Sequence, residues 1–221
     1  QQSQIGQNSN YYLADCYLRS GNTLSARTAF YNVSKLPYQD NIREEALFNY
    51  GKLSAELGFE RESITALNGF GPESKYYDEA QNIIGDVLDR TKDYDNAIRT
   101  IESIKNPSQR LKAAYQQLAY RRALQLINED RPGEARVLLS KAIEPSYDKN
   151  ISLSAMYWQA DLAHRQGDFN LSVQLVDKFT AAAGTGKDLK DPMLLPMANY
   201  LQGYNQLKKE AFLPAGEQFN A

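Results

Sequence analysis

Pairs of small residues recur along this chain at a fixed spacing, and this pattern constrains the fold more than any other feature. In each pair the second small residue follows the first by twelve positions, and a large apolar residue follows the second by four. Only Gly, Ala or Ser lets two helices cross closely, so a repeat of such pairs predicts stacked helical hairpins. The six sets are Ala14, Ala26 and Phe30; Gly51, Ser63 and Leu67; Gly85, Ala97 and Ile101; Ala123, Ala135 and Leu139; Ala160, Ser172 and Val176; Gly203, Ala215 and Phe219.

The segments between paired residues carry the turn chemistry that a helix-turn-helix unit needs. We expect Asp93, Asp130 and Asp168 to cap the second helices of their hairpins, and Pro132 to occupy a first turn. One hairpin cannot bury its own apolar stripe, so the units must stack and share a core. The sequence therefore predicts an all-α, right-handed solenoid of about six hairpins in a single domain, over residues 7–39, 40–73, 74–107, 108–147, 148–184 and 190–221.

Two residues depart from this pattern. Arg122 stands beside Ala123, where an apolar residue would be expected, and Pro214 falls just inside the second helix of the last hairpin. We expect the Arg122 side chain to extend along the helix into solvent and Pro214 to occupy a first turn.

Composition and charge exclude several classes of function. The chain has 25 Lys and Arg against 27 Asp and Glu, a formal charge of -2, which favours neither nucleic acid nor anionic lipid as a partner. Its single cysteine, Cys16, allows no intrachain disulfide and no Cys-rich zinc site. No apolar stretch is long enough for a membrane-spanning helix. We expect no cofactor, no metal, no nucleic acid partner and no insertion of this segment into a membrane.

The sequence also offers little catalytic chemistry. His164 is the only histidine, and nothing in the repeat brings it to a nucleophile. We expect Cys16 to be a buried, inert thiol among apolar neighbours. The run Gly184–Lys187 lacks the first glycine and the final Ser or Thr of a phosphate-binding loop and is better interpreted as a connector. We therefore expect that the chain is not an enzyme and has no catalytic residues.

The first hairpin resembles the tetratricopeptide repeat family. The resemblance is carried by the segment Tyr12-Leu13-Ala14-Asp15-Cys16-Tyr17 with Gly21, Ala26, Phe30 and Pro37, and it extends from about Asn8 to the end of the chain. It implies a protein that binds a partner protein or peptide. More loosely, the segments 45–53 and 76–80 look like envelope-associated repeat proteins of bacteria, related to the Tol-Pal coordinator and the outer-membrane assembly lipoproteins. That resemblance implies a role in cell-envelope assembly or organisation, a periplasmic or envelope location rather than a cytoplasmic one, and a longer parent protein.

In the tetratricopeptide family the concave face is formed by the first helix of each hairpin, at positions three before and one and four after its small residue. Five of the six positions three before are aromatic here, and Asp86, Asp89 and Asp161 favour a partner with Lys or Arg. The aromatic rings could serve either a partner or the packing of the next repeat, and a variant lacking the Tyr120 and Tyr157 rings would separate the two. The residues carried over are Tyr11, Asp15, Phe48, Lys52, Asn82, Asp86, Asp89, Tyr120, Tyr157, Asp161, His164, Tyr200 and Tyr204.

Three alternatives stay open at this point. The repeats could be the recruiting or regulatory arm of a larger enzyme, a glycan-binding surface protein, or a cytosolic co-chaperone. The last is disfavoured because Asn8, Tyr11, Asp15, Phe48 and Lys52 do not match the Lys and Asn set that grips a peptide carboxylate. We also expect self-association through exposed terminal repeats.

Overall fold

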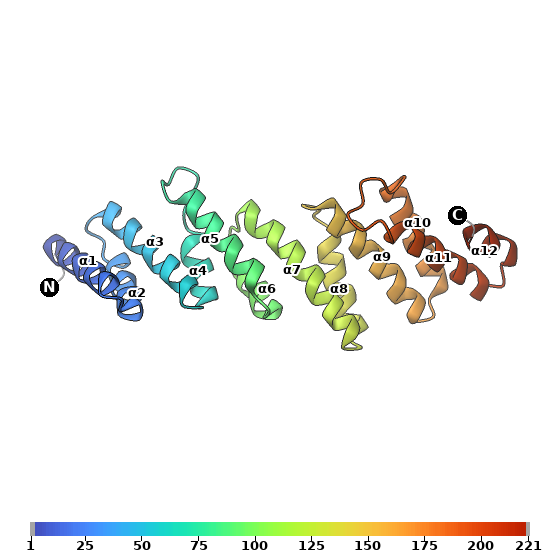
Figure 1. The fold of residues 1–221 in the computed structure, drawn as a ribbon, viewed down its shortest axis with the longest axis horizontal. Coiled ribbons are helices and arrows are strands. Elements are labelled where there is room, and N and C mark those ends of the chain that lie inside the picture. Colours follow the sequence, from blue (N-terminus) through green and yellow to red (C-terminus); the bar gives the residue numbers. More distant parts are fainter. Residues whose placement is uncertain (1–2, 220–221) are drawn as a thin grey trace. The chain divides into compact units, whose positions relative to one another are not determined.

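A computed structural model describes residues 3–219 and shows twelve α-helices and no strand over that range (Figure 1). The prediction of an all-α helical-hairpin repeat is confirmed. The helices are, in order, α1 (Gln4–Arg19), α2 (Thr23–Ser34), α3 (Asp40–Glu56), α4 (Glu60–Leu67), α5 (Tyr77–Arg90), α6 (Tyr94–Glu102), α7 (Gln109–Asn128), α8 (Pro132–Ile143), α9 (Lys149–Arg165), α10 (Phe169–Ala183), α11 (Leu194–Lys208) and α12 (Phe212–Phe219).

The described residues form two compact units, divided within α7 between Ala114 and Tyr115. Unit 1 holds α1 to α6 and the start of α7, and unit 2 holds the rest of α7 and α8 to α12. The last five helix pairs fall inside the repeat bounds expected from the sequence, whereas the first begins earlier, at Gln4.

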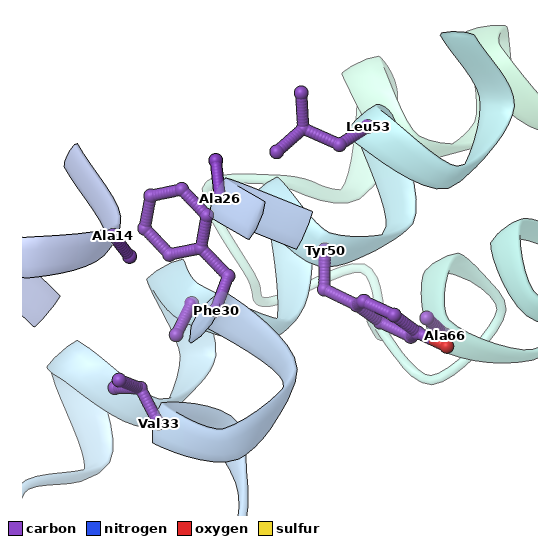
Figure 2. Close-up of a cluster of buried hydrophobic side chains, with 8 residues drawn as sticks. Ala14, Ala26, Phe30, Val33, Tyr50, Leu53 and Ala66 are labelled. Carbon is purple, nitrogen blue, oxygen red and sulfur yellow. The ribbon is translucent and has the colours of Figure 1, made fainter. Parts of the chain in front are cut away.

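The paired small residues lie at the centres of the hairpins. All twelve are buried. In unit 1 the Phe30 ring packs in one cluster with Ala14 and Ala26 (Figure 2). A Cβ atom added at Gly51 would lie 2.6 Å from the Leu67 side chain, and close approach is therefore the reason that a large residue is absent there.

In the last hairpin the equivalent glycine contacts a residue that is more exposed to solvent. A Cβ atom added at Gly203 would lie 2.6 Å from Cε1 of Phe219, the residue that corresponds to Leu67. Leu67 is fully buried, but Phe219 is 43% exposed. The same pattern of residues thus gives a fully buried contact between α3 and α4 and a partly exposed contact between α11 and α12.

In five of the six hairpins the turn contains one left-handed residue, seven positions after the first small residue. Gly21, Gly58 and Gly167 adopt it with φ of 77°, 81° and 79°. Asp130 and Glu210 adopt it as non-glycine residues, with φ of 55° and 58°. A left-handed backbone disfavours most side chains but tolerates Asp, so the sequence at residue 130 fits this turn position.

Two of the three expected helix caps are present. The Asp93 carboxylate accepts the N–H of Asn96 and the Asp168 carboxylate accepts the N–H of Leu171, both at 3.0 Å. The prediction for Asp130 is wrong, because it occupies the left-handed turn position and Arg131 precedes α8 without a side-chain cap.

Both expected prolines lie in first turns. Pro132 is the first residue of α8, and Pro214 lies in the first turn of α12. Their missing N–H groups fall where a helix has no internal acceptor for them.

Arg122 does not extend into solvent as expected. Its side chain is only 11% exposed, and its Nη1 lies 2.8 Å from Oε1 of Glu129 and 3.2 Å from Oε1 of Gln125. Gln125 lies further along α7 and Glu129 directly follows its last residue, so the guanidinium is paired close to the end of this helix.

Cys16 is exposed, which contradicts the expectation of a buried thiol. Leu53, at the corresponding position of α3, is buried in the cluster that contains Ala14, Ala26 and Phe30 of the preceding hairpin. No hairpin precedes α1 within residues 3–219, so nothing in that range covers Cys16. The periodicity alone could not distinguish these two cases.

Candidate functional site

The residues predicted to contact a partner all lie on the first helices of the hairpins, and they divide between the two units. Unit 1 holds those from Tyr11 to Asp89, and unit 2 holds those from Tyr120 to Tyr204. They differ widely in exposure, and this difference decides which of them a partner could touch.

In unit 1 the aromatic side chains of the predicted set mainly pack against other residues of the protein. The Tyr11 ring packs edge-on against Phe30, and its hydroxyl donates to Oε1 of Glu45 at 2.7 Å. Burial, followed by this bond to a carboxylate, raises the pKa of Tyr11 above its ordinary value. Phe48 is buried and stacks on Tyr76 with ring centroids 4.5 Å apart. Neither ring offers a partner a broad free face.

The charged residues of unit 1 form local pairs or lie open to solvent. Asp15 pairs with Arg19 at 2.7 Å, and Lys52 pairs with Glu79 of the next hairpin at 2.8 Å. The remaining three predicted residues follow helical spacing along α5 and are all exposed: Asn82, Asp86 and Asp89. They form one polar stripe on that helix.

In unit 2 the Tyr120 hydroxyl forms hydrogen bonds with Trp158 and Ser154 of the next hairpin, and burial raises its pKa. The connection to Ser154 matches that of Tyr11 to Glu45, because both join equivalent positions of adjacent hairpins. At Tyr11 and Tyr120 the hydroxyl therefore connects one hairpin to the next.

Five predicted residues line one pocket of about 470 Å³ between α9 and α11, here called the unit 2 pocket. Other residues of the pocket come from the start of α11 and the residue before it. The lining consists of Tyr157, Asp161, His164, Met193, Pro196, Met197, Tyr200, Leu201 and Tyr204.

The aromatic side chains of the unit 2 pocket are not equivalent. Tyr157 is only 6% exposed and packs edge-on against Phe179, so its ring belongs to the core and little of it is open to the pocket. Removal of this ring is therefore expected to disturb the core as well as the pocket. Tyr200 and Tyr204 are exposed, with ring centroids 5.1 Å apart. They are the rings that a ligand can reach.

A chain of hydrogen bonds fixes the His164 ring at the pocket. Ser172 Oγ donates to the carbonyl of Ala160, Asn205 Nδ2 donates to Ser172 Oγ, and Asn205 Oδ1 lies 2.8 Å from His164 Nδ1. Because the Asn205 amide nitrogen is already donating to Ser172, its oxygen is the acceptor and His164 donates from Nδ1. Asn205 is fully buried, so the imidazole is held by a rigid partner.

Asp161 is the charged group of the pocket. Its Oδ2 lies 2.6 Å from Nε of Arg165, one turn along α9, but the two atoms do not meet at hydrogen-bonding angles, and Oδ2 is buried without a hydrogen bond. Burial, followed by the charge of Asp161, raises the pKa of Tyr157 to about 12. Arg165 opposes this shift to a smaller extent.

Sequence reasoning missed one position that recurs at these contacts, six residues before the first small residue of a hairpin. It is occupied by Glu45, Glu79, Ser154 and Met197. The first three contact Tyr11, Lys52 and Tyr120 of the preceding hairpin, and Met197 lines the unit 2 pocket. The helical period provides a signal for it, since it lies one turn before the aromatic position.

The described residues show neither a group of His, Cys, Asp and Glu that could hold a metal ion nor a helix long and apolar enough to cross a membrane.

The chain was compared with protein families, curated proteins and solved structures. No protein family and no curated protein matches the chain. Among solved structures it is similar to the kinesin light chain TPR-like repeats of Podosopora anserina, at 12% identity and a TM-score of 0.39, covering all of this chain and 94% of that one. It is also similar to the apo form of the quorum sensor NprR from B. thuringiensis, at 11% identity and a TM-score of 0.39, covering 96% of this chain and 73% of that one. At so low an identity the assignment of the fold depends on this chain's own helices and buried small residues.

Proposed function

We propose that this chain is a protein-interaction scaffold that binds a partner protein or peptide on the first helices of its hairpins, and that it is not an enzyme. The observation that carries the proposal is the unit 2 pocket, where five residues expected from the repeat pattern line one volume of about 470 Å³. Pockets of this size are typical of sites that enclose a side chain or a small ligand.

The composition of the pocket supports a protein partner. Tyr200 is 58% exposed, Tyr204 38% and Met193 58%. Tyr and Met are enriched at protein interfaces because they offer a large contact area, and Tyr also keeps a polar tip. Exposed residues of this kind gather here on one helix, and this favours a contact surface over simple packing.

We further propose that the chain acts in the assembly or organisation of a bacterial cell envelope. This part depends on the sequence resemblance of the segments 45–53 and 76–80 alone. Fractionation of the source cells, followed by immunodetection, tests it: recovery with the envelope or periplasm is expected, and recovery with the cytosol alone would contradict it.

The binding proposal is tested by site-specific photo-crosslinking in the source cells. A photoreactive phenylalanine analogue is placed at Tyr200 or Tyr204, and at Val137 as a control, since Val137 is 57% exposed on α8 outside the pocket. We expect one or a few discrete protein adducts from Tyr200 and Tyr204 and none of these from Val137.

A matched pair of variants completes this experiment. Replacement of Tyr200 and Tyr204 by Ala should abolish co-purification of the crosslinked partner, whereas Val137→Ala should leave it unchanged. Equal recovery from all three proteins would show that the pocket is not the binding surface.

A further inference from the structure

We propose that the unit 2 pocket receives a positively charged side chain, arginine or lysine, from an extended segment of the partner. This inference rests on the proposed binding function and specifies the chemistry of its ligand.

The walls of the pocket suit a long side chain with an apolar stem. On the α11 side, Met193, Met197 and Leu201 provide flexible and apolar contacts. On the facing helix, Tyr157 and His164 line the volume. Arginine and lysine bury their aliphatic stems along surfaces of this kind while the charged head reaches a polar group.

The polar group is Asp161, the one carboxylate among the nine lining residues, which include no lysine or arginine. Its side chain is only 14% exposed, and its buried Oδ2 has no hydrogen bond. A largely buried carboxylate attracts a cationic N–H donor more strongly than a solvated one, so a ligand that reaches the accessible part of Asp161 gains more here than at an exposed carboxylate.

Arg165 already forms an ion pair with Asp161, but it does not occupy the place of the proposed ligand cation. Its side chain is 56% exposed, so it pairs with Asp161 from the solvent side, where ion pairs contribute little. At the Tyr157 hydroxyl the carboxylate outweighs it, because Asp161 shifts the pKa of Tyr157 upwards by more than Arg165 shifts it down. At this wall of the pocket the carboxylate is therefore the stronger of the two charges.

The aromatic rings add a second attraction for a cation. Tyr200 and Tyr204 have ring centroids 5.1 Å apart and an interplanar angle of 50°, and the His164 ring lies 6.3 Å from Tyr204. A guanidinium or ammonium group gains energy over the face of a tyrosine ring, and guanidinium also stacks on it. An anionic ligand would be repelled by Asp161, and a neutral one would lack the charge attraction to the carboxylate and to the ring faces.

The methionines allow a direct test. The chain has three, of which Met193 and Met197 line the pocket, whereas Met156 packs against the buried cluster of α9, α10 and α11 and serves as an internal reference. The full chain is labelled with ¹³C at the methionine methyl groups and titrated with acetylated alanine pentapeptide amides carrying a central arginine, lysine, citrulline or norleucine. Citrulline keeps the size of arginine without its charge, and norleucine keeps the aliphatic stem of lysine without its ammonium group.

We expect the Met193 and Met197 signals to shift and saturate with the arginine or lysine peptide, while Met156 moves little. The neutral peptides should bind at least about ten-fold more weakly. Asp161→Asn should weaken binding of the basic peptide by about ten-fold. Asp188→Asn, which removes the same charge from an exposed loop residue of unit 2, should not change it.

Because Asp161 is largely buried, Tyr200→Ala provides a second variant that leaves the core intact, and it should also weaken binding. Equal affinity for basic and neutral peptides, or no effect of Asp161→Asn, overturns the proposal. So does the absence of any shift at Met193 and Met197. If the Asp161→Asn protein still retains the crosslinked partner, the chain is a scaffold whose partner does not use a basic side chain, and only this inference fails. If no crosslinks form at Tyr200 or Tyr204, the proposed binding function itself is refuted.

Discussion

The side-chain carbonyl of Gln116 accepts the backbone N–H of Asp148 at 2.7 Å, and thereby fixes the residue that precedes α9. The Gln116 amide nitrogen donates in turn to the carbonyls of Ala142 and Asp148. Gln7 makes the same connection in unit 1, where its oxygen accepts the N–H of Gln39 at 2.8 Å. Both glutamines lie seven residues before the first small residue of their hairpins, and both are buried. A buried amide thus anchors the start of the next hairpin.

Replacement of Gln116 by Leu should lower the free energy of unfolding by about 2 kcal/mol or more, because several buried backbone groups would lose their partner. Urea denaturation followed by circular dichroism measures this. Gln174→Leu is the control, since Gln174 is exposed on α10. If the two variants were equally stable, the anchoring role of Gln116 would be refuted.

Gly51→Ala should destabilise the protein by about 1–3 kcal/mol, although the same change in an open helix is stabilising. The added methyl group would meet Leu67, which is fully buried and cannot move aside. Gly203→Ala should cost less, because Phe219 can turn towards solvent. Thermal unfolding compares these with Gly133→Ala, where a Cβ atom meets nothing within 4 Å. A neutral Gly51→Ala would contradict the close approach.

The stability of the protein should fall as pH rises from about 10 to 12. The pKa of Tyr157 is raised from 10.0 to about 12 in the folded protein, so the unfolded chain loses this proton first. The associated stability is complete below pH 10 and is lost as pH rises to the folded value, by up to about 2 kcal/mol. Urea midpoints at pH 9 and pH 11 should differ less in Tyr157→Phe. Tyr12→Phe, a change at an exposed ring, should behave like the unchanged protein.

Self-association stays a prediction, and the exposed apolar residues of α12 make it testable. Phe212 is 68% exposed and the adjacent Leu213 is 85% exposed. Adjacent apolar side chains at this exposure favour association. Sedimentation velocity over a hundred-fold range of concentration should show a larger species that Leu213→Glu abolishes. A sedimentation coefficient independent of concentration would count against it.

Much of the fold follows from the sequence because the geometry of close helix crossings allows few residue types. The fixed spacing between Ala14 and Ala26, repeated in every hairpin, identified the twelve buried contact positions, and the caps Asp93 and Asp168 followed from local chemistry. These are short-range properties, set by residues within one hairpin.

The residues that sequence reasoning placed wrongly depend on neighbours that are distant in the chain. Cys16 and Leu53 occupy the same position of the repeat, yet one is exposed and the other buried, because only the second is covered by a preceding hairpin. Tyr157 and Tyr200 likewise match in sequence, but one ring enters the core and the other remains in solvent.

The sequence by itself determined the type of repeat, the helices that would pair, and the face from which the candidate site would be built. Only the tertiary structure decided that five of the expected residues meet in one pocket, that Asp161 has a buried oxygen without a hydrogen bond there, and that Gln116 anchors the next hairpin. The physical reason is that helical periodicity specifies the direction of a side chain from its own axis, whereas burial, pairing and enclosure depend on what the neighbouring hairpin brings to the same place.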